Sequence, residues 1–528
     1  MKKEIFIRCI NCLVLSSAFI VVSLVYNTHY LTELVRYPGT YLLSGIVIAM
    51  VFYLIGWILR TVLPIATIKM NNASESLDAI LKSGRIKWLT GGYIVLLVIV
   101  YFSCFFAYFP GITAYDYRSS VNQVSGKEIL SNHHPVAYTM IWKLFISIAG
   151  LMGDADGSKH YSNIMYAVVQ IAVVLLICIY LIRWMIKSGI PKLWILFTGM
   201  YFLFIPTLHL FSFSPTKDVP FACAIIFFST KLIDYFKGKT SWISCLCGGI
   251  LACLFRNNMV YVLIGLFIIL LLMHFEWRKV IKGILPAVIF AMMFTKIILP
   301  VCGIRSTESA EYLSVPVNQI SALYSFEAYF SEDERATIKQ YMPEVENYNY
   351  RFADPVKNHF NNELYKKDTA TFWKIYLSGL KQNPMIYLCA FIDTNSPLLY
   401  PLSTPIDEYN GREYIELGQD PGIDRERITE AFKYLRGYYD SIGSATNPAI
   451  ELPFINRYFS LAFPFVSLIT ALFCMIILDK WKREDIIASI VLLLLLGTYL
   501  LGPVSNYRYC YPLYLSFPLY FGVIFKKG

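Results

Sequence analysis

Long runs of apolar residues, separated by short polar connections, recur along most of the chain. A helix needs roughly 20 residues to cross the ~30 Å hydrocarbon core of a membrane, and many of these runs approach that length. The pattern therefore predicts an all-α polytopic membrane protein with about twelve transmembrane helices. The spans are expected at residues 9–26, 40–59, 88–109, 164–182, 193–211, 219–236, 242–255, 259–275, 283–302, 459–479, 486–502 and 510–525.

The apolar pattern stops between residues 303 and 458, where amphipathic stretches take its place. Ser331-Glu332-Asp333-Glu334 is a capping-box pattern, and Pro343 is expected to end the helix that it starts. Residues 369–382 and 424–439 also have helical periodicity. The sequence thus predicts a mainly helical extracytoplasmic domain at 303–458, between a membrane domain at 1–302 and a second membrane part at 459–528.

The charge distribution follows this division. Hydrophobic residues make up 56% of the chain and charged residues 16%, whereas soluble domains carry about 25% charged residues. Residues 303–458 hold 15 Lys and Arg against 22 Asp and Glu, so this segment has a net charge of −7 and the rest of the chain +17. A basic membrane part beside an acidic soluble part argues against a nucleic-acid partner and indicates a positive cytoplasmic face.

The basic residues also predict the orientation. With the N-terminus inside, the cytoplasmic connections hold 21 Lys and Arg, and the short outer connections hold four. The positive-inside rule then places both termini in the cytoplasm. It also makes the apolar segment 136–152 a juxtamembrane or re-entrant helix in the first outer loop, 110–163. A genuine span at 136–152 stays an alternative.

The first outer loop contains the first candidate chemistry. Asp116 follows the end of a predicted span, where its carboxylate could take a proton from a substrate or bind a metal ion. His133 and His134 precede Pro135 at the start of the next helix, and they are the second pair of candidate catalytic residues. The alternatives are a helix-capping aspartate and two interfacial histidines.

Further polar residues lie at the outer ends of later spans. The candidate substrate-binding or phosphate-binding residues are Lys217, Asp218, Arg256, Asn257, Tyr507 and Arg508. Arginine suits phosphate because its guanidinium can donate two parallel hydrogen bonds. The competing explanations are that Asp218 stabilises a helix N-terminus and that Arg256 only closes a turn. Their common position on the outer face favours a shared site.

The order of these features resembles the GT-C superfamily of membrane glycosyltransferases. The similarity consists of a span, an outer loop with an acid at Asp116, a His-Pro element at His134-Pro135, and then many more spans. In that superfamily the acid of the first outer loop is a key residue, and basic residues near the outer membrane face contact the lipid phosphate. The resemblance implies the first role for Asp116 and the second for Lys217, Arg256 and Arg508.

A closer resemblance is to a family of uncharacterised bacterial membrane proteins, over about residues 100–510. It is carried by several short motifs: Pro110-Gly111, His133-His134-Pro135, Thr216-Lys217-Asp218, Phe255-Arg256-Asn257-Asn258 and Asp354-Pro355-Val356-Lys357.

The function expected from the superfamily resemblance is transfer of a sugar from a polyprenyl-phosphate carrier to a cell-envelope glycan on the outer face of a bacterial cytoplasmic (inner) membrane. The partners would be the lipid-linked sugar, the glycan acceptor and the bilayer. The cofactor stays open, with a divalent metal ion on Asp116 as one option. The alternatives are a transporter or flippase of an envelope lipid or sugar, and a non-enzymatic assembly factor, polymerase or ligase.

Overall fold

The computed structural model describes residues 2–526 except 82–85, 113–114, 156, 158, 327–328, 404–431, 444–459 and 481–483. For the helical residues 2–7, 73–81, 86–89, 115–116 and 441–443 it describes the backbone alone. Within this part of the chain the regular elements are helices, and the strand-type pairing consists of two isolated bridges. The predicted all-α class is confirmed for the described residues.

Six helical stretches are long and apolar enough to cross a membrane. They lie in α1 (Lys2–Thr28), α3 (Pro38–Leu81), α4 (Ile86–Ala107), α7 (Tyr161–Lys187), α10 (Asp218–Phe236) and α13 (Trp277–Met293), which continues through η1 (Phe294–Ile298) and α14 (Leu299–Val301). By length and composition, these stretches make the chain a helical membrane protein. They coincide with six of the twelve predicted spans.

The other six predicted spans correspond to shorter helices. These are α8 (Lys192–Phe204) with α9 (Pro206–Phe211), α11 (Trp242–Phe255), α12 (Met259–Leu272), α26 (Phe463–Ile477), α27 (Ile487–Tyr499) and α28 (Tyr507–Gly522). The single helix predicted at 193–211 is instead two helices. Proline disfavours helical conformation in the residue before it, and Ile205, before Pro206, is extended at φ −84° and ψ 108°.

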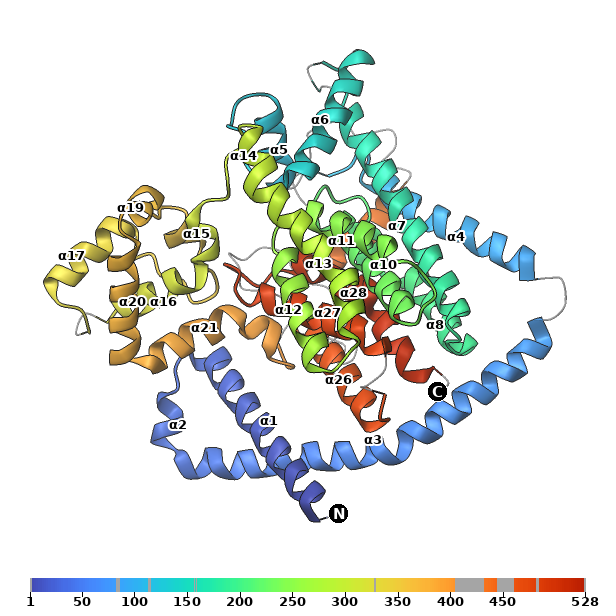
Figure 1. The fold of residues 1–528 in the computed structure, drawn as a ribbon, viewed down its shortest axis with the longest axis horizontal. Helices are drawn as coiled ribbons and strands as arrows, with labels where there is room; N and C mark the ends of the chain where they lie inside the picture. Colours follow the sequence, from blue (N-terminus) through green and yellow to red (C-terminus); the bar gives the residue numbers. More distant parts are fainter. Residues whose placement is uncertain are drawn as a thin grey trace.

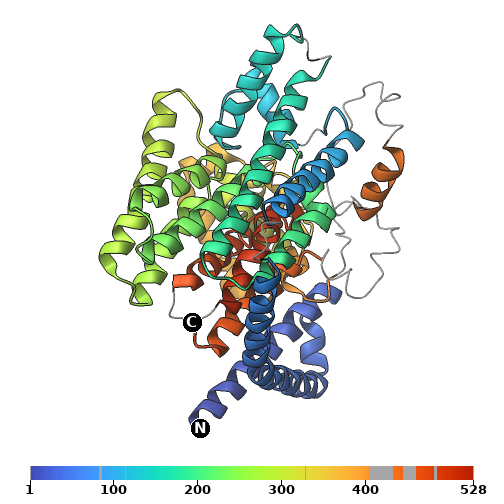
Figure 2. The same ribbon diagram turned by 90° about the vertical axis from the view of Figure 1, so that its right-hand side faces the viewer.

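The helix α10 lies at the centre of the bundle (Figure 1), where it packs against α7, α11, α27 and α28. Its apolar stretch is 72% buried, whereas the stretch in α3 is only 6% buried. Figures 1 and 2 both place α3 at the lower edge of the molecule, together with α1, on which it packs. The apolar surface of α3 suits contact with lipid, because most of it is exposed beyond its contacts with α1, α8 and α26.

Small residues bring α10 and α11 close together. A Cβ added at Gly248 would lie 2.9 Å from the backbone Cα of Phe228, and one at Gly249 would lie 2.7 Å from the Cβ of Ala287. Glycine lets helix backbones approach closely in membranes, where packing rather than the hydrophobic effect drives association. The glycine pair therefore holds α11 between α10 and α13.

The segment predicted as a separate domain contains its own apolar core, built from residues between Ala310 and Tyr387. Its helices, which Figure 1 shows on the left, are α15 (Ser309–Tyr312), α16 (Ser314–Tyr324), α17 (Glu332–Tyr341), α18 (Asp354–Lys357), α19 (Asn362–Lys367), α20 (Thr369–Gln382) and α21 (Pro384–Leu399). The capping box of Ser331 and Glu334 is confirmed, and α20 has the predicted bounds. Half of the predicted helix at 424–439 lies outside the described residues, which contain α23 (Lys433–Gly443).

The helix α21 connects this second core to α1. Its residues Cys389 and Ile392 form a small apolar cluster with Leu24 and Val25 of α1. The same face carries Asp393, which is 1% exposed. A polar group therefore lies inside the contact that joins the two parts.

Two basic side chains face the buried carboxyl of Asp393. His29 Nδ1 lies 3.0 Å from Asp393 Oδ1, and Arg351 Nη1 lies 3.9 Å from the same oxygen. Burial raises the pKa of Asp393 to about 6, although His29 and Arg351 act in the opposite direction. The folded protein thus holds this proton more tightly than the unfolded chain, in which the pKa is near 3.8.

This raised pKa predicts a pH dependence of stability. The stabilisation is complete below pH ~4 and is lost as the pH rises through about 6, a change of about 2–3 kcal/mol. Asp393→Asn mimics the protonated carboxyl. In detergent micelles the variant should match the wild type in thermal midpoint at pH 4.5 and exceed it at pH 7.5. An equal loss of stability at both pH values would contradict this prediction.

Candidate functional site

Asn132, in the loop before α6 (Val136–Leu151), joins three segments that are distant in sequence. Its backbone N–H donates to Arg305 O at 2.8 Å, and its carbonyl accepts from Asn257 Nδ2 at 2.8 Å and from Thr307 Oγ1 at 2.9 Å. Its side-chain oxygen accepts from Val136 N at 3.2 Å, which fixes the start of α6. The loop 110–163 is thereby held against the α11–α12 turn and the segment that follows α14.

A second crossing joins the outer helical region to α28. Phe352 and Val504 form an antiparallel bridge, and Ala353 N donates to Pro503 O at 2.9 Å. The short helix α18 begins directly after this bridge, so it is fixed near the start of α28.

A cavity of about 1230 Å³ lies between these two crossings. Basic side chains lining it are Lys217, Arg305, Lys357, Lys366 and Arg508. Acidic side chains lining it are Glu128, Glu308, Glu311, Asp354 and Glu363, and both His133 and His134 also contribute. A cavity with this many ionisable groups, contributed by the apolar helix bundle and by the helical region 309–399 together, is the candidate functional site.

Lys217 and His134 form the best-defined contact on the membrane side of the cavity. Lys217 precedes α10, and its Nζ lies 2.7 Å from His134 Nδ1. A lysine ammonium has donors only, so Nδ1 accepts, and a neutral imidazole then carries its proton on Nε2. His134, which is 3% exposed, is thus placed to orient Lys217. Its predicted catalytic part stays a prediction.

His133 leads to a group of charges that the sequence did not single out as a site. Its Nδ1 lies 3.8 Å from Glu311 Oε1, and Lys357 Nζ lies 3.0 Å from both Glu311 Oε1 and Asp354 Oδ1. Burial alone would lower the pKa of Lys357, but the two carboxylates outweigh it and raise the pKa above its usual value. Lys357 therefore stays charged inside the protein.

Asp218 and Arg256 lie beneath the cavity rather than in its wall. Arg256 Nε is 3.2 Å from Asp218 Oδ1, with side chains 9% and 0% exposed. The guanidinium also lies 4.6 Å from the ring centroid of Tyr499 and 4.8 Å from that of Tyr509. Tyr509 lines the cavity, whereas Arg256 does not. The phosphate contact predicted for Arg256 has no support from this position.

Two further predicted binding residues are also absent from the cavity lining. Tyr507 is 2% exposed and stacks on Tyr514 at 4.6 Å between ring centroids. Asn257 is half-buried, and its side chain is hydrogen-bonded to Asn132. Neither side chain lines the cavity, whereas the side chain of the neighbouring Arg508 does.

Asp116 is the second residue of α5 (Tyr115–Val124), and its side chain lies outside the described residues. Its predicted catalytic and metal-binding parts therefore stay predictions. Over the part of the chain that the structure describes, no group of three or more His, Cys, Asp and Glu side chains is arranged to hold a metal ion.

Comparison with protein families decides where the chain belongs. A family of unknown function, DUF6020, matches residues 125–527. The chain belongs to this DUF6020 family. The match includes every charged side chain and both histidines of the cavity, whereas Asp116 precedes it. Comparisons with curated proteins and with solved structures find no match.

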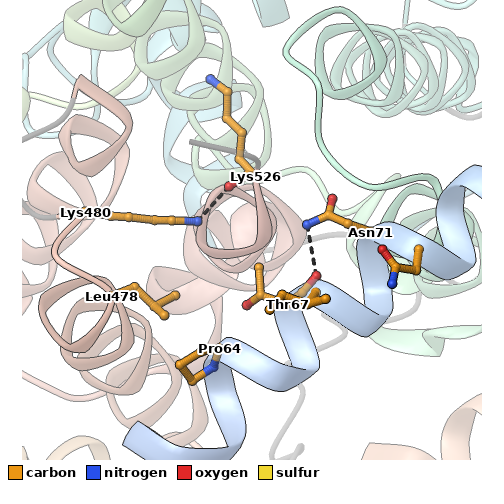
Figure 3. Close-up of a pocket in the computed structure, with 8 residues that line it drawn as sticks. Pro64, Thr67, Asn71, Leu478, Lys480 and Lys526 are labelled. Carbon is orange, nitrogen blue, oxygen red and sulfur yellow. Dashed lines mark hydrogen bonds between the residues drawn. The ribbon is translucent and has the colours of Figure 1, made fainter.

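A second cavity of this DUF6020 member, of about 400 Å³, lies between α3 and the C-terminal segment (Figure 3). Lys480 Nζ donates to Ile524 O and Lys526 O, both at 2.6 Å. The Lys526 ammonium points away from this cavity in Figure 3 and lies 3.2 Å from Asp485 Oδ2. The two lysines anchor the C-terminal segment, so this cavity is not a candidate site.

The ion pair beneath the main cavity predicts a strong effect on stability. Asp218→Asn leaves Arg256 buried without its counter-charge, which should cost about 3–5 kcal/mol of unfolding free energy. The free energy can be measured by chemical unfolding in micelles. Adding Arg256→Met should recover part of the loss, because no unpaired charge then remains.

Glu363→Gln is the matched control, because Glu363 forms an exposed ion pair with Lys366. It should change the free energy of unfolding by less than about 0.5 kcal/mol. If Asp218→Asn and Glu363→Gln changed the free energy of unfolding equally, a structural role of the buried pair would be ruled out.

Proposed function

We propose that this protein is a GT-C-like membrane glycosyltransferase of about twelve spans. It moves a sugar from a polyprenyl-phosphate carrier to a cell-envelope acceptor on the outer face of a bacterial cytoplasmic membrane. The observation that carries the proposal is the main cavity, in which basic groups, carboxylates and histidines line one space of about 1230 Å³.

The positions of the charges support a reaction that releases phosphate. Lys217 and Arg508 come from the outer ends of α10 and α28, next to apolar helices along which a polyprenyl chain would lie. As the bond between sugar and phosphate breaks, negative charge grows on the phosphate, and fixed cations lower that barrier. The carboxylates opposite would bind sugar hydroxyls and accept a proton.

The membrane arrangement belongs to the same proposal. The shorter apolar helices would complete the twelve spans, with both termini in the cytoplasm and residues 303–458 outside. The distribution of Lys and Arg between connections supports this orientation.

A transporter or flippase is the second candidate, and interrupted helices favour it. The α8–α9 segment is broken at Ile205, and α13 passes into the π-helical segment η1. Transporters place such breaks at their substrate sites. Neither break contributes a residue to the charged cavity, which favours the glycosyltransferase.

Purified protein in lipid vesicles separates the two candidates. The donors are polyprenyl phosphates that carry radiolabelled glucose, galactose or mannose, and the acceptor is envelope glycan. We expect label to move to the glycan. Movement of the donor between leaflets without transfer would identify a flippase and reject the glycosyltransferase.

Lys217→Met and Arg508→Met should each lower the transfer rate roughly a hundredfold, because each removes a cation at the leaving phosphate. Lys339→Met is the control, since Lys339 pairs with Glu346 on the surface, away from the cavity. Transfer by both cavity variants at the rate of this control would contradict the assignment of the phosphate site.

A further inference from the structure

We propose that Glu311 is the general base of the main cavity, which removes the proton from the acceptor hydroxyl. This inference rests on the proposed glycosyltransferase function. It is carried by the contacts of Glu311 with His133 and with Lys357.

The side chains of Glu311 and Lys357 differ in exposure, which distinguishes their roles. The side chain of Glu311 is 29% exposed and lines the cavity, so a ligand can reach it. The side chain of Lys357 is 7% exposed. Lys357 is therefore a positioning residue, which holds the carboxylate of Glu311 in place.

Lys357 offsets only part of the negative charge around Glu311. One ammonium, that of Lys357, serves two carboxylates, those of Glu311 and Asp354. The trio thus carries a net charge of −1. The imidazole of His133, 3.8 Å from Glu311 Oε1, offers a route for the later release of a proton.

Three of the other four acidic side chains of the cavity have partners other than His133 and Lys357. Glu128 accepts from Asn122 and Ser119, and Glu308 accepts from Asn362. Glu363 pairs with Lys366 one helical turn away.

The fourth, Asp354, pairs with Lys357 within the single turn of α18. Glu311 differs from all four because its contacts join α15 both to the first outer loop and to α18.

A continuous row of polar contacts leads from Glu311 to the predicted phosphate side. The rings of His133 and His134 lie 4.6 Å apart between centroids, and His134 contacts Lys217. The base and the cation that faces the phosphate are thereby held at opposite ends of one histidine pair.

Sugar transfer forms one bond and breaks one bond at the anomeric carbon of the donor. The acceptor oxygen forms a bond to the anomeric carbon of the donor sugar. The bond from that carbon to the phosphate oxygen breaks, and its electron pair leaves with the polyprenyl phosphate. The acceptor proton passes to a carboxylate oxygen of Glu311.

The test compares Glu311→Gln with the wild type in vesicles, using whichever of the three radiolabelled polyprenyl-phosphate sugars the wild type transfers. Retention of labelled donor by the variant should stay within about twofold of the wild type. Transfer should fall roughly a hundredfold or more, because general-base catalysis contributes about 10²–10⁴ in rate. Glu346→Gln, at a surface carboxylate that pairs with Lys339 and does not line the cavity, should transfer at the wild-type rate.

Glu311→Asp guards against a variant that fails to fold. It keeps the charge for Lys357 and shortens the reach of the carboxylate, so it should fold, bind donor and transfer slowly. Transfer at the wild-type rate by either Glu311 variant would overturn the assignment and leave the glycosyltransferase proposal standing. A wild type that transfers none of the three sugars would reject both.

Discussion

The buried ion pair of Asp218 and Arg256 is the interaction on which the candidate site depends. Charges removed from water must be compensated, and each partner here is more than 90% buried. This need for a buried counter-charge fixes the start of α10 against the α11–α12 turn. Tyr499 and Tyr509 on either side of the guanidinium add the ends of α27 and α28 to the same arrangement.

Each partner of this buried pair is next in sequence to a residue that lines the cavity or holds its rim. Lys217 precedes Asp218 and reaches the cavity, and Asn257 follows Arg256 and holds Asn132. Arg508 precedes Tyr509 and also reaches the cavity. One buried contact thus helps to set the positions of three separate parts of the cavity and its rim.

The sequence could predict where the helices and polar residues lie along the chain. It could not predict which of the polar side chains face the cavity. The length of the apolar runs predicted the helices, and the capping box of Ser331 and Glu334 predicted the start of α17. Both signals are local in the sequence. The polar residues at the outer ends were also recognised. Whether Lys217 or Asp218 faces the cavity depends on the packing of other helices, which neighbouring positions in a sequence do not reveal.

The position of Glu311 in the cavity was even harder to predict from the sequence. It lies in an ordinary polar stretch, and its importance comes from His133 and Lys357, which are far away in the chain. The Asp354–Lys357 motif was visible in the sequence, but as a family feature and not as part of the cavity. Long-range pairing of charges therefore had to come from the structure.

The cavity has one wall from the apolar helix bundle and one from the helical region 309–399, so its shape depends on how these two parts are joined. Hydrogen bonds at Asn132 and the bridge at Phe352 hold the rim, and α21 holds the outer core against α1. The buried Asp393 lies in that last contact, where ionisation weakens the packing. The separation of Lys217 and Glu311 is thus set by contacts at both ends of the outer region, and a change at α21 would act on the cavity without any residue of the cavity being altered.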